Sequence, residues 1–181
     1  CQDYPNKTEI LFGVDPANSD AIDAIARLSS DQNSANIRVV LCPRSTAGNP
    51  KVDKLICLAK EARFEQLVLS DADVTIPPKF LREMLSEFSL NKPDLTCCFY
   101  RLCGGIDFPQ KLECATNNID FWSRVAQAQS LGPIDFALGA TMTLTQTALQ
   151  EIGGFESVAN HIADDYQLGH RLHAIGRSVT I

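Results

Sequence analysis

Short apolar runs alternate along this chain with longer segments in which apolar residues recur every three or four positions. Short apolar runs are typical of buried strands, whereas the longer spacing is typical of helices with one buried face. Strands that alternate with helices predict an α/β fold with a largely parallel sheet flanked by helices. The predicted strands cover residues 9–14, 37–41, 66–70, 95–100 and 137–144, and helices are expected to begin near residues 19, 51, 78, 112, 145 and 164.

The length of the chain predicts one compact domain. It has 181 residues, of which 45% are hydrophobic, and no repeat or low-complexity segment divides it. The chain opens on a loop-like stretch and closes on what looks like the start of a strand near residue 178. We therefore expect a single domain over residues 1–181, cut at both ends from a longer protein. No apolar run approaches the ~20 residues of a membrane span, so this piece is expected to be soluble.

Charge and cysteine content exclude some classes of protein. The formal net charge is −6, which argues against a general nucleic-acid binder, because such proteins need a basic surface. The seven cysteines include no C-x-x-C pair of the kind found in zinc and redox sites. They are best interpreted as small buried side chains in a reducing compartment, with disulfides and zinc as the alternatives.

Two carboxylates follow the predicted strand 66–70. In α/β folds ligands bind at the carboxyl ends of strands, and Asp71 and Asp73 lie at such an end. Oxygen ligands of this kind suit Mg²⁺ or Mn²⁺, with substrate phosphates completing the coordination. The alternative is ordinary turn chemistry ahead of the next helix.

A second acidic pair, Asp164 and Asp165, opens the last predicted helix. Acidic side chains in a first helical turn are favoured by the helix dipole, which is the simplest explanation. The other interpretation is that one of the two points into a cleft as a general base.

Three further residues are candidate ligands for a nucleotide. Asn49 and Lys51 stand at the start of a predicted helix, where free N–H groups and an ammonium could bind an anion, although a solvated lysine is the alternative. Asp15 follows the first strand and could accept hydrogen bonds from a base or ribose, or simply serve the turn before Pro16. The histidines near the last helix are interpreted as surface residues, and Trp122 as a core or groove-wall residue.

In this order these pieces resemble the family 2 type of inverting glycosyltransferases with a GT-A fold. The likeness is greatest to the ceramide glucosyltransferase group and its bacterial relatives, including the hopanoid-biosynthesis enzymes. The last two matching stretches are specific when taken together, whereas Asp-Ala-Asp alone is not. The stretches cover residues 2–5 with 9–14, 49–52, 69–74 with 77–78, 139–142, and 153–155 with 163–169.

The resemblance implies a GT-A, Rossmann-like fold and a role for each candidate. Asp165 is implied to be the catalytic base and Asp164 its acidic neighbour. Asp71 and Asp73 are implied to lie around the metal and diphosphate. The implied donor ligands are Asp15, Asn49, Lys51, Asp71 and Gly139.

The implied reaction transfers a glucose or N-acetylglucosamine type of sugar from a UDP-sugar to a lipid hydroxyl, such as that of ceramide or a hopanoid. Mg²⁺ or Mn²⁺ assists, and the anomeric configuration inverts. The full protein would work at the cytosolic face of a membrane and contact it through segments absent here. A first strand and a Q-x-x-R-W motif of the family are also absent from this chain, so the piece alone is expected to be less active or inactive.

Other functions stay open at this point. The acceptor could be a polysaccharide or cell-wall intermediate, or the piece could bind a nucleotide sugar without turnover. A nucleotidyltransferase is disfavoured, because a glycine-rich basic loop would be expected where Val14-Asp15-Pro16-Ala17 stands. All of the glycosyltransferase hypotheses require Asp71 and Asp165 to converge on one crevice.

Overall fold

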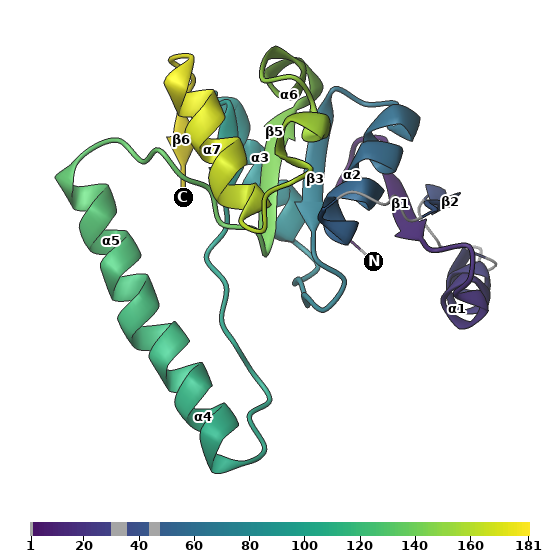
Figure 1. Ribbon diagram of the computed structural model, residues 1–181, viewed down its shortest axis with the longest axis horizontal. Coiled ribbons are helices and arrows are strands. Elements are labelled where there is room, and N and C mark those ends of the chain that lie inside the picture. Colours follow the sequence, from purple (N-terminus) through teal and green to yellow (C-terminus); the bar gives the residue numbers. More distant parts are fainter. Residues whose placement is uncertain (1, 30–35, 44–47) are drawn as a thin grey trace.

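The computed structural model describes residues 2–29, 36–43 and 48–181, which form a mixed α/β fold (Figure 1). The strands pair into two sheets, and helices lie against them. The elements are β1 Glu9–Val14, α1 Ser19–Ser29, β2 Asn36–Leu41, α2 Pro50–Glu61, β3 Gln66–Ser70, α3 Phe80–Asn91, β4 Leu95–Cys97, α4 Phe108–Ala115, the π-helical segment η1 Thr116–Phe121, α5 Trp122–Leu131, β5 Thr141–Thr145, α6 Gln146–Glu151, the 3-10 segment η2 Phe155–Val158, α7 Asp164–Ala174 and β6 Val179–Thr180.

The smaller sheet pairs β1 with β2 in parallel, as the alternating pattern predicts. Helix α2 packs against both strands, and a Cβ atom on Gly13 of β1 would come within 3.2 Å of the Leu58 side chain of α2. Arg38 of β2 links the two layers, because its guanidinium lies 3.0 Å from the Glu9 carboxylate of β1 and 2.6 Å from that of Glu61 on α2. The amino-terminal part of the chain is thereby attached to α2, which begins at the site described below.

The larger sheet has the strand order β3-β5-β4-β6, and here the prediction of a mostly parallel sheet is wrong. Strand β5 runs antiparallel to both β3 and β4, and only β4 and β6 pair in parallel. The chain leaves β4, passes through the long helical segment 108–131 and enters β5 at the same end of the sheet, where Cys97 pairs with Met142, so β5 runs antiparallel to β4. Alternating strands and helices predict the elements, but they do not encode the direction in which a long connection returns.

Two strand boundaries also differ from the prediction. The run at 95–100 is a strand only to Cys97, after which the chain leaves the sheet, and the run at 137–144 becomes strand only at Thr141. After the strand ends, the Trp122 indole N–H donates to the Tyr100 carbonyl at 2.7 Å and ties this segment to the long helix. The segment after Cys97 is therefore held against the long helix rather than within the sheet.

The hydrophobic core lies around the larger sheet. Leu144 of β5, Leu95 of β4 and Leu168 of α7 have no exposed surface, and Phe155 of η2 is 1% exposed. Burying a leucine of this kind stabilises the fold by about 1.5–3 kcal/mol. Helix α7, whose first turn carries the acidic pair, is thus held by its apolar face directly against the sheet.

The long helix predicted over 112–131 begins earlier, at Phe108, and includes a π-helical turn at η1. Asp107 caps it by accepting from the Gln110 N–H at 2.9 Å, and Pro109 occupies the first turn, where its missing N–H costs nothing. Figure 1 shows this helix extending away from the sheets. Within the described residues, no helix is both long and apolar enough to cross a membrane.

Candidate functional site

A lysine and three aspartates meet at the amino-terminal ends of α2 and α7. Lys51 lies in the first turn of α2, where its ammonium is 2.9 Å from Asp71 Oδ1 and 4.0 Å from Asp164 Oδ2. Asn49 caps the same helix, since its Oδ1 accepts from the Lys51 N–H at 3.0 Å. Lys51 therefore contacts carboxylates from two other elements, and the interpretation of a simply solvated lysine is wrong.

Asp71 is placed by the end of β3. The pairing of β3 with β5 extends one step past the strand, because the Asp71 N–H donates to the Ala140 carbonyl at 3.1 Å. Gly139 and Ala140 precede β5, and they lie beside Asp71 because β5 runs antiparallel to β3. The carboxyl end of β3 and the amino end of β5 thus form one rim of the site.

Asp165 lies on the other side of the same short segment. A Cβ atom on Gly139 would stand only 2.7 Å from Asp165 Oδ2 and 3.1 Å from its Cβ atom, so the absence of a side chain at Gly139 makes room for this carboxylate. The Tyr166 N–H donates to Asp165 Oδ1 at 2.8 Å. Asp71 and Asp165 flank Gly139–Ala140 and so lie at the same rim of the sheet. That both face one crevice stays a prediction, because only Asp165 lines the cleft described next.

The Asp165 carboxylate lines a cleft of about 500 Å³. The long helix forms one wall and the Phe136–Gly139 segment the other, with aromatic side chains between them. The long helix contributes Phe121, Arg124 and Val125 to the lining, and Tyr100 and Tyr166 also line the cleft. An acidic group at the edge of a largely apolar, aromatic cleft can meet a hydroxyl carried by an otherwise apolar molecule.

Asp164 differs from its neighbour, because it is buried at 5% exposure. Its Oδ1 accepts from Asn49 Nδ2 at 3.2 Å, and its Oδ2 has no hydrogen-bond partner among the described residues. Burial raises the pKa of the Asp164 carboxyl, and the nearby Lys51 ammonium opposes that shift. Asp164 holds the start of α7 against α2, while Asp165 faces the cleft.

The charge of Lys51 is maintained by its surroundings. Burial acts to lower the pKa of its ammonium, but the hydrogen bond to Asp71 and the charges of Asp164, Asp71 and Asp165 outweigh burial, and the net pKa is raised. Lys51 is therefore a cation at neutral pH, placed between the carboxylates of β3 and α7.

The other predicted ligands lie at the ends of β3 and β1. Asp73 is exposed in the turn after β3, two positions from Asp71. Asp15 follows β1 and its Oδ1 accepts from the Ala17 N–H at 2.9 Å, the geometry expected of a turn. A role for Asp15 beside a nucleotide stays a prediction.

Where the structure is described, no group of three or more His, Cys, Asp or Glu side chains is placed to hold a metal ion. The donors present after β3 are two carboxylates, which match the oxygen preference of Mg²⁺ and Mn²⁺. Two carboxylates are enough for such an ion only when substrate phosphates supply further oxygen ligands. Binding of Mg²⁺ or Mn²⁺ together with the substrate phosphates stays a prediction.

The sequence interpretation missed an aromatic stack on α7. The Tyr166 ring is parallel to that of Phe136, with centroids 6.5 Å apart, and to that of His170, at 5.9 Å. His170 Nδ1 also lies 3.5 Å from Asp135 Oδ2, so this histidine has specific partners although it is half exposed. The spacing of Tyr166 and His170, one helical turn apart, was the available signal.

Three of the described cysteines, Cys42, Cys97 and Cys98, are unsuited to nucleophilic chemistry. The six that the structure describes are free thiols, and burial raises the pKa of Cys97 to about 12 and that of Cys98 to about 11. Burial, with a contribution from the neighbouring Cys57, raises the pKa of Cys42 to about 11. These three thiols stay protonated at neutral pH.

Replacing Lys51 with methionine is expected to destabilise the fold in a pH-dependent way. The stability that the charged Lys51 side chain contributes is fully present below pH 10.5 and is lost as pH rises through its raised folded pKa. The pKa of Asp164 is also raised in the folded protein, so ionising this carboxyl costs stability as pH rises from 3.8 through that raised pKa. Without the Lys51 ammonium nearby, keeping the buried Asp164 carboxylate charged costs more stability. We expect a loss of about 1 kcal/mol at pH 8, discounted for the exposure of Lys51, and a smaller loss at pH 4.

Urea unfolding at the two pH values measures this effect. The matched control is Lys60→Met on the same helix. Lys60 is 70% exposed, and its ion pair with Glu156 is long, at 3.8 Å. The control is expected to change the free energy of unfolding by less than about 0.5 kcal/mol at either pH. A loss for Lys51→Met that is equal at pH 4 and pH 8 would contradict the proposed coupling to Asp164.

These features define a mixed α/β protein in which carboxylates and one lysine converge beside a cleft, an arrangement suited to the glycosyltransferase class. The family model described as "Glycosyl transferase family 21" matches residues 1–181, and the chain belongs to this family. It is similar to ceramide glucosyltransferase 1 of Caenorhabditis elegans, with 20% identity over 176 residues, which cover 96% of this chain and 37% of that protein. The resemblance to the ceramide glucosyltransferase group is thereby confirmed, whereas its family 2 label stays an expectation.

Proposed function

We propose that the protein containing this chain transfers a sugar from a UDP-sugar to a lipid hydroxyl, with a GT-A type of fold and inversion at the anomeric carbon. The observation that carries the proposal is the convergence of Lys51, Asp71 and Asp165 beside Gly139–Ala140. Family membership supports glycosyl transfer, and the name of the nematode relative supports a glucose donor and a ceramide-like acceptor.

In the proposed reaction Asp165 acts as the general base. Its carboxylate takes the proton of the acceptor hydroxyl while the hydroxyl oxygen forms a bond to the anomeric carbon. The bond from that carbon to the diphosphate oxygen breaks on the opposite face, and UDP leaves with the electron pair. Asp165 suits this role better than Asp164, because it lines the cleft whereas Asp164 is buried against Asn49.

The leaving diphosphate needs positive charge near Asp71. Asp71 and Asp73 would hold Mg²⁺ or Mn²⁺ together with the phosphates, and the ion would neutralise charge on the leaving group. Lys51 contributes a cation already fixed at the start of a helix, where N–H groups also favour an anion. Asn49 holds the start of α2, with Lys51, against the start of α7, with Asp164, through its three side-chain hydrogen bonds.

We further propose that the site works on the cytosolic side of a membrane. The described cysteines are free thiols, as is usual in a reducing compartment, and a lipid acceptor requires access to a bilayer. Membrane contact through segments outside this chain belongs to the same proposal.

The test is turnover by the full protein. UDP release from UDP-glucose and UDP-N-acetylglucosamine is measured with a ceramide, a hopanoid or an oligosaccharide acceptor, in Mn²⁺ and in chelator. We expect UDP and a glycolipid to form only with a lipid acceptor and the metal. Calorimetric binding of UDP without product would instead favour a nucleotide-sugar binding module, and turnover only with the oligosaccharide would favour polysaccharide synthesis.

A further inference from the structure

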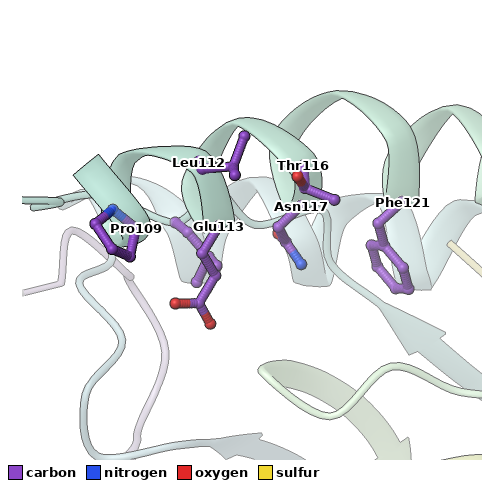
Figure 2. A pocket seen from close by; sticks show the side chains of 7 residues that line it. Pro109, Leu112, Glu113, Thr116, Asn117 and Phe121 are labelled. Carbon is purple, nitrogen blue, oxygen red and sulfur yellow. The ribbon is translucent and has the colours of Figure 1, made fainter.

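A second hollow lies on the same face of the long helix as the cleft at Asp165. Figure 2 shows side chains from successive turns of the helix that line this groove, which measures about 520 Å³. Phe121 lines both hollows, so the groove continues the cleft along the helix. The lining residues of the groove include Leu102, Pro109, Leu112, Asn117 and Phe121.

The groove wall is held by specific bonds. Asn118 of η1 fastens the opposite wall, because its Nδ2 donates to the Leu102 carbonyl and its Oδ1 accepts from the Leu102 N–H, each at 2.9 Å. The Trp122 bond to Tyr100 anchors the same segment one turn further along. The π-helical turn that carries Asn118 is of a kind often found at functional sites.

The groove and its rim present exposed apolar side chains, next to the polar Glu113, Thr116 and Asn117 of the lining. Leu112 is 56% exposed, and Ile106 and Phe108 at the tip are 85% and 78% exposed. Asn117 Oδ1, in the groove, is buried and has no hydrogen-bond partner in the part of the chain that the structure describes. The exposed apolar side chains indicate a ligand that is mainly apolar.

The dimensions fit one hydrocarbon chain. From Phe121 to Pro109 the helix rises roughly 18 Å at 1.5 Å per residue. One leaflet of a bilayer has a hydrocarbon thickness of about 15 Å, which is the length of a single lipid chain. A hydrocarbon chain of that length that enters the groove at Phe121 would therefore reach about as far as Leu112, roughly 13 Å along the helix.

We propose that this groove binds the hydrocarbon chain of the lipid acceptor and so aligns its hydroxyl with Asp165. The inference rests on the proposed function and adds the acceptor subsite. Continuity with the cleft, through Phe121, is what selects the acceptor as the occupant over a second copy of the chain or a protein partner. Leu112 is then a specificity residue for chain length, far from the reacting atoms.

The test compares two leucine-to-serine variants of the full protein. Leu112→Ser removes an apolar groove side chain, and Leu131→Ser removes a side chain of the same type that is 81% exposed at the end of α5, outside the groove. Each is assayed with a long-chain acceptor and with a short-chain acceptor of identical head group. We expect Leu112→Ser to raise KM for the long-chain acceptor about tenfold, with kcat and the short-chain KM unchanged, and Leu131→Ser to match the unaltered protein.

The outcomes separate this inference from the proposed function. Equal KM values for both variants, or equal losses with both acceptors, would overturn the groove assignment while glycosyl transfer stood. A change in sedimentation of Leu112→Ser without a chain-length effect would overturn it in favour of a contact between copies. Absence of UDP release by the unaltered protein with any acceptor would instead overturn the proposed function.

Discussion

Asp165→Asn is expected to lower kcat by about 10²- to 10⁴-fold, the usual contribution of a positioned general base. Asparagine keeps the size of the side chain, so its Oδ1 can still accept from the Tyr166 N–H, but the amide cannot take a proton from the acceptor. UDP affinity, measured by calorimetry, is expected to stay unchanged because Asp165 is not assigned a contact to the nucleotide. The measurement is single-turnover sugar transfer by the full protein.

Two further aspartate variants make the result specific. Asp23→Asn changes an exposed aspartate on α1 and is expected to leave kcat unaltered. Asp164→Asn alters the buried neighbour, which contacts Asn49 rather than the cleft, and is expected to lower kcat less than Asp165→Asn. If Asp164→Asn abolished turnover while Asp165→Asn retained it, the two carboxylates would have to exchange roles.

Gly169→Ala is expected to destabilise the protein by about 2–3 kcal/mol, as overpacking does, and to lower Tm by about 5–10 °C. Gly169 lies inside α7, and a Cβ atom there would overlap the backbone of Phe136 and Ala137, standing 2.8 Å from Phe136 Cα. Alanine is normally favoured over glycine in a helix by about 1 kcal/mol, so a loss of stability would reflect packing alone. Thermal unfolding measures the change.

Gly132→Ala is the matched control for this substitution. Gly132 follows α5 with a φ of 162°, an extended conformation that alanine adopts, and nothing lies within 4 Å of a Cβ atom built there. Its Tm is expected to stay the same or to rise slightly, because alanine restricts the unfolded chain. A Gly169→Ala protein as stable as the Gly132→Ala protein would show that α7 does not approach Phe136–Ala137 as closely as described.

Several elements could be predicted because their causes are local. β1 and β3 have the predicted bounds, and Gly176 ends α7 at a φ of 81°, with the Arg177 N–H bonded to the Leu172 carbonyl, as a left-handed helix terminus requires. The long helix begins four residues before its predicted start, and the local signal for the true start is the cap at Asp107 with Pro109 in the first turn. Such signals act over one helical turn and are visible in the sequence.

The sequence predicted which residues belong to the candidate site better than it predicted the contacts between them. Asp71, Asp165 and Gly139 were named from a family likeness, and the structure brings them together, but Lys51 was expected to meet an anionic ligand rather than two carboxylates of the chain. The contact of Asn49 with Asp164 joins residues 115 positions apart, and no local pattern encodes such a contact. The catalytic roles of all these residues stay proposals.

The sequence by itself determined where strands and helices form and which residue types stand at their ends, because hydrophobic spacing, caps and turns act between near neighbours. Only the tertiary structure decided that β5 runs antiparallel, that Gly139 makes room for Asp165, and that Phe121 lines both the groove and the cleft along the long helix. These features depend on how distant segments pack against one another, and that packing is set by the combined volume and burial of residues from the whole chain.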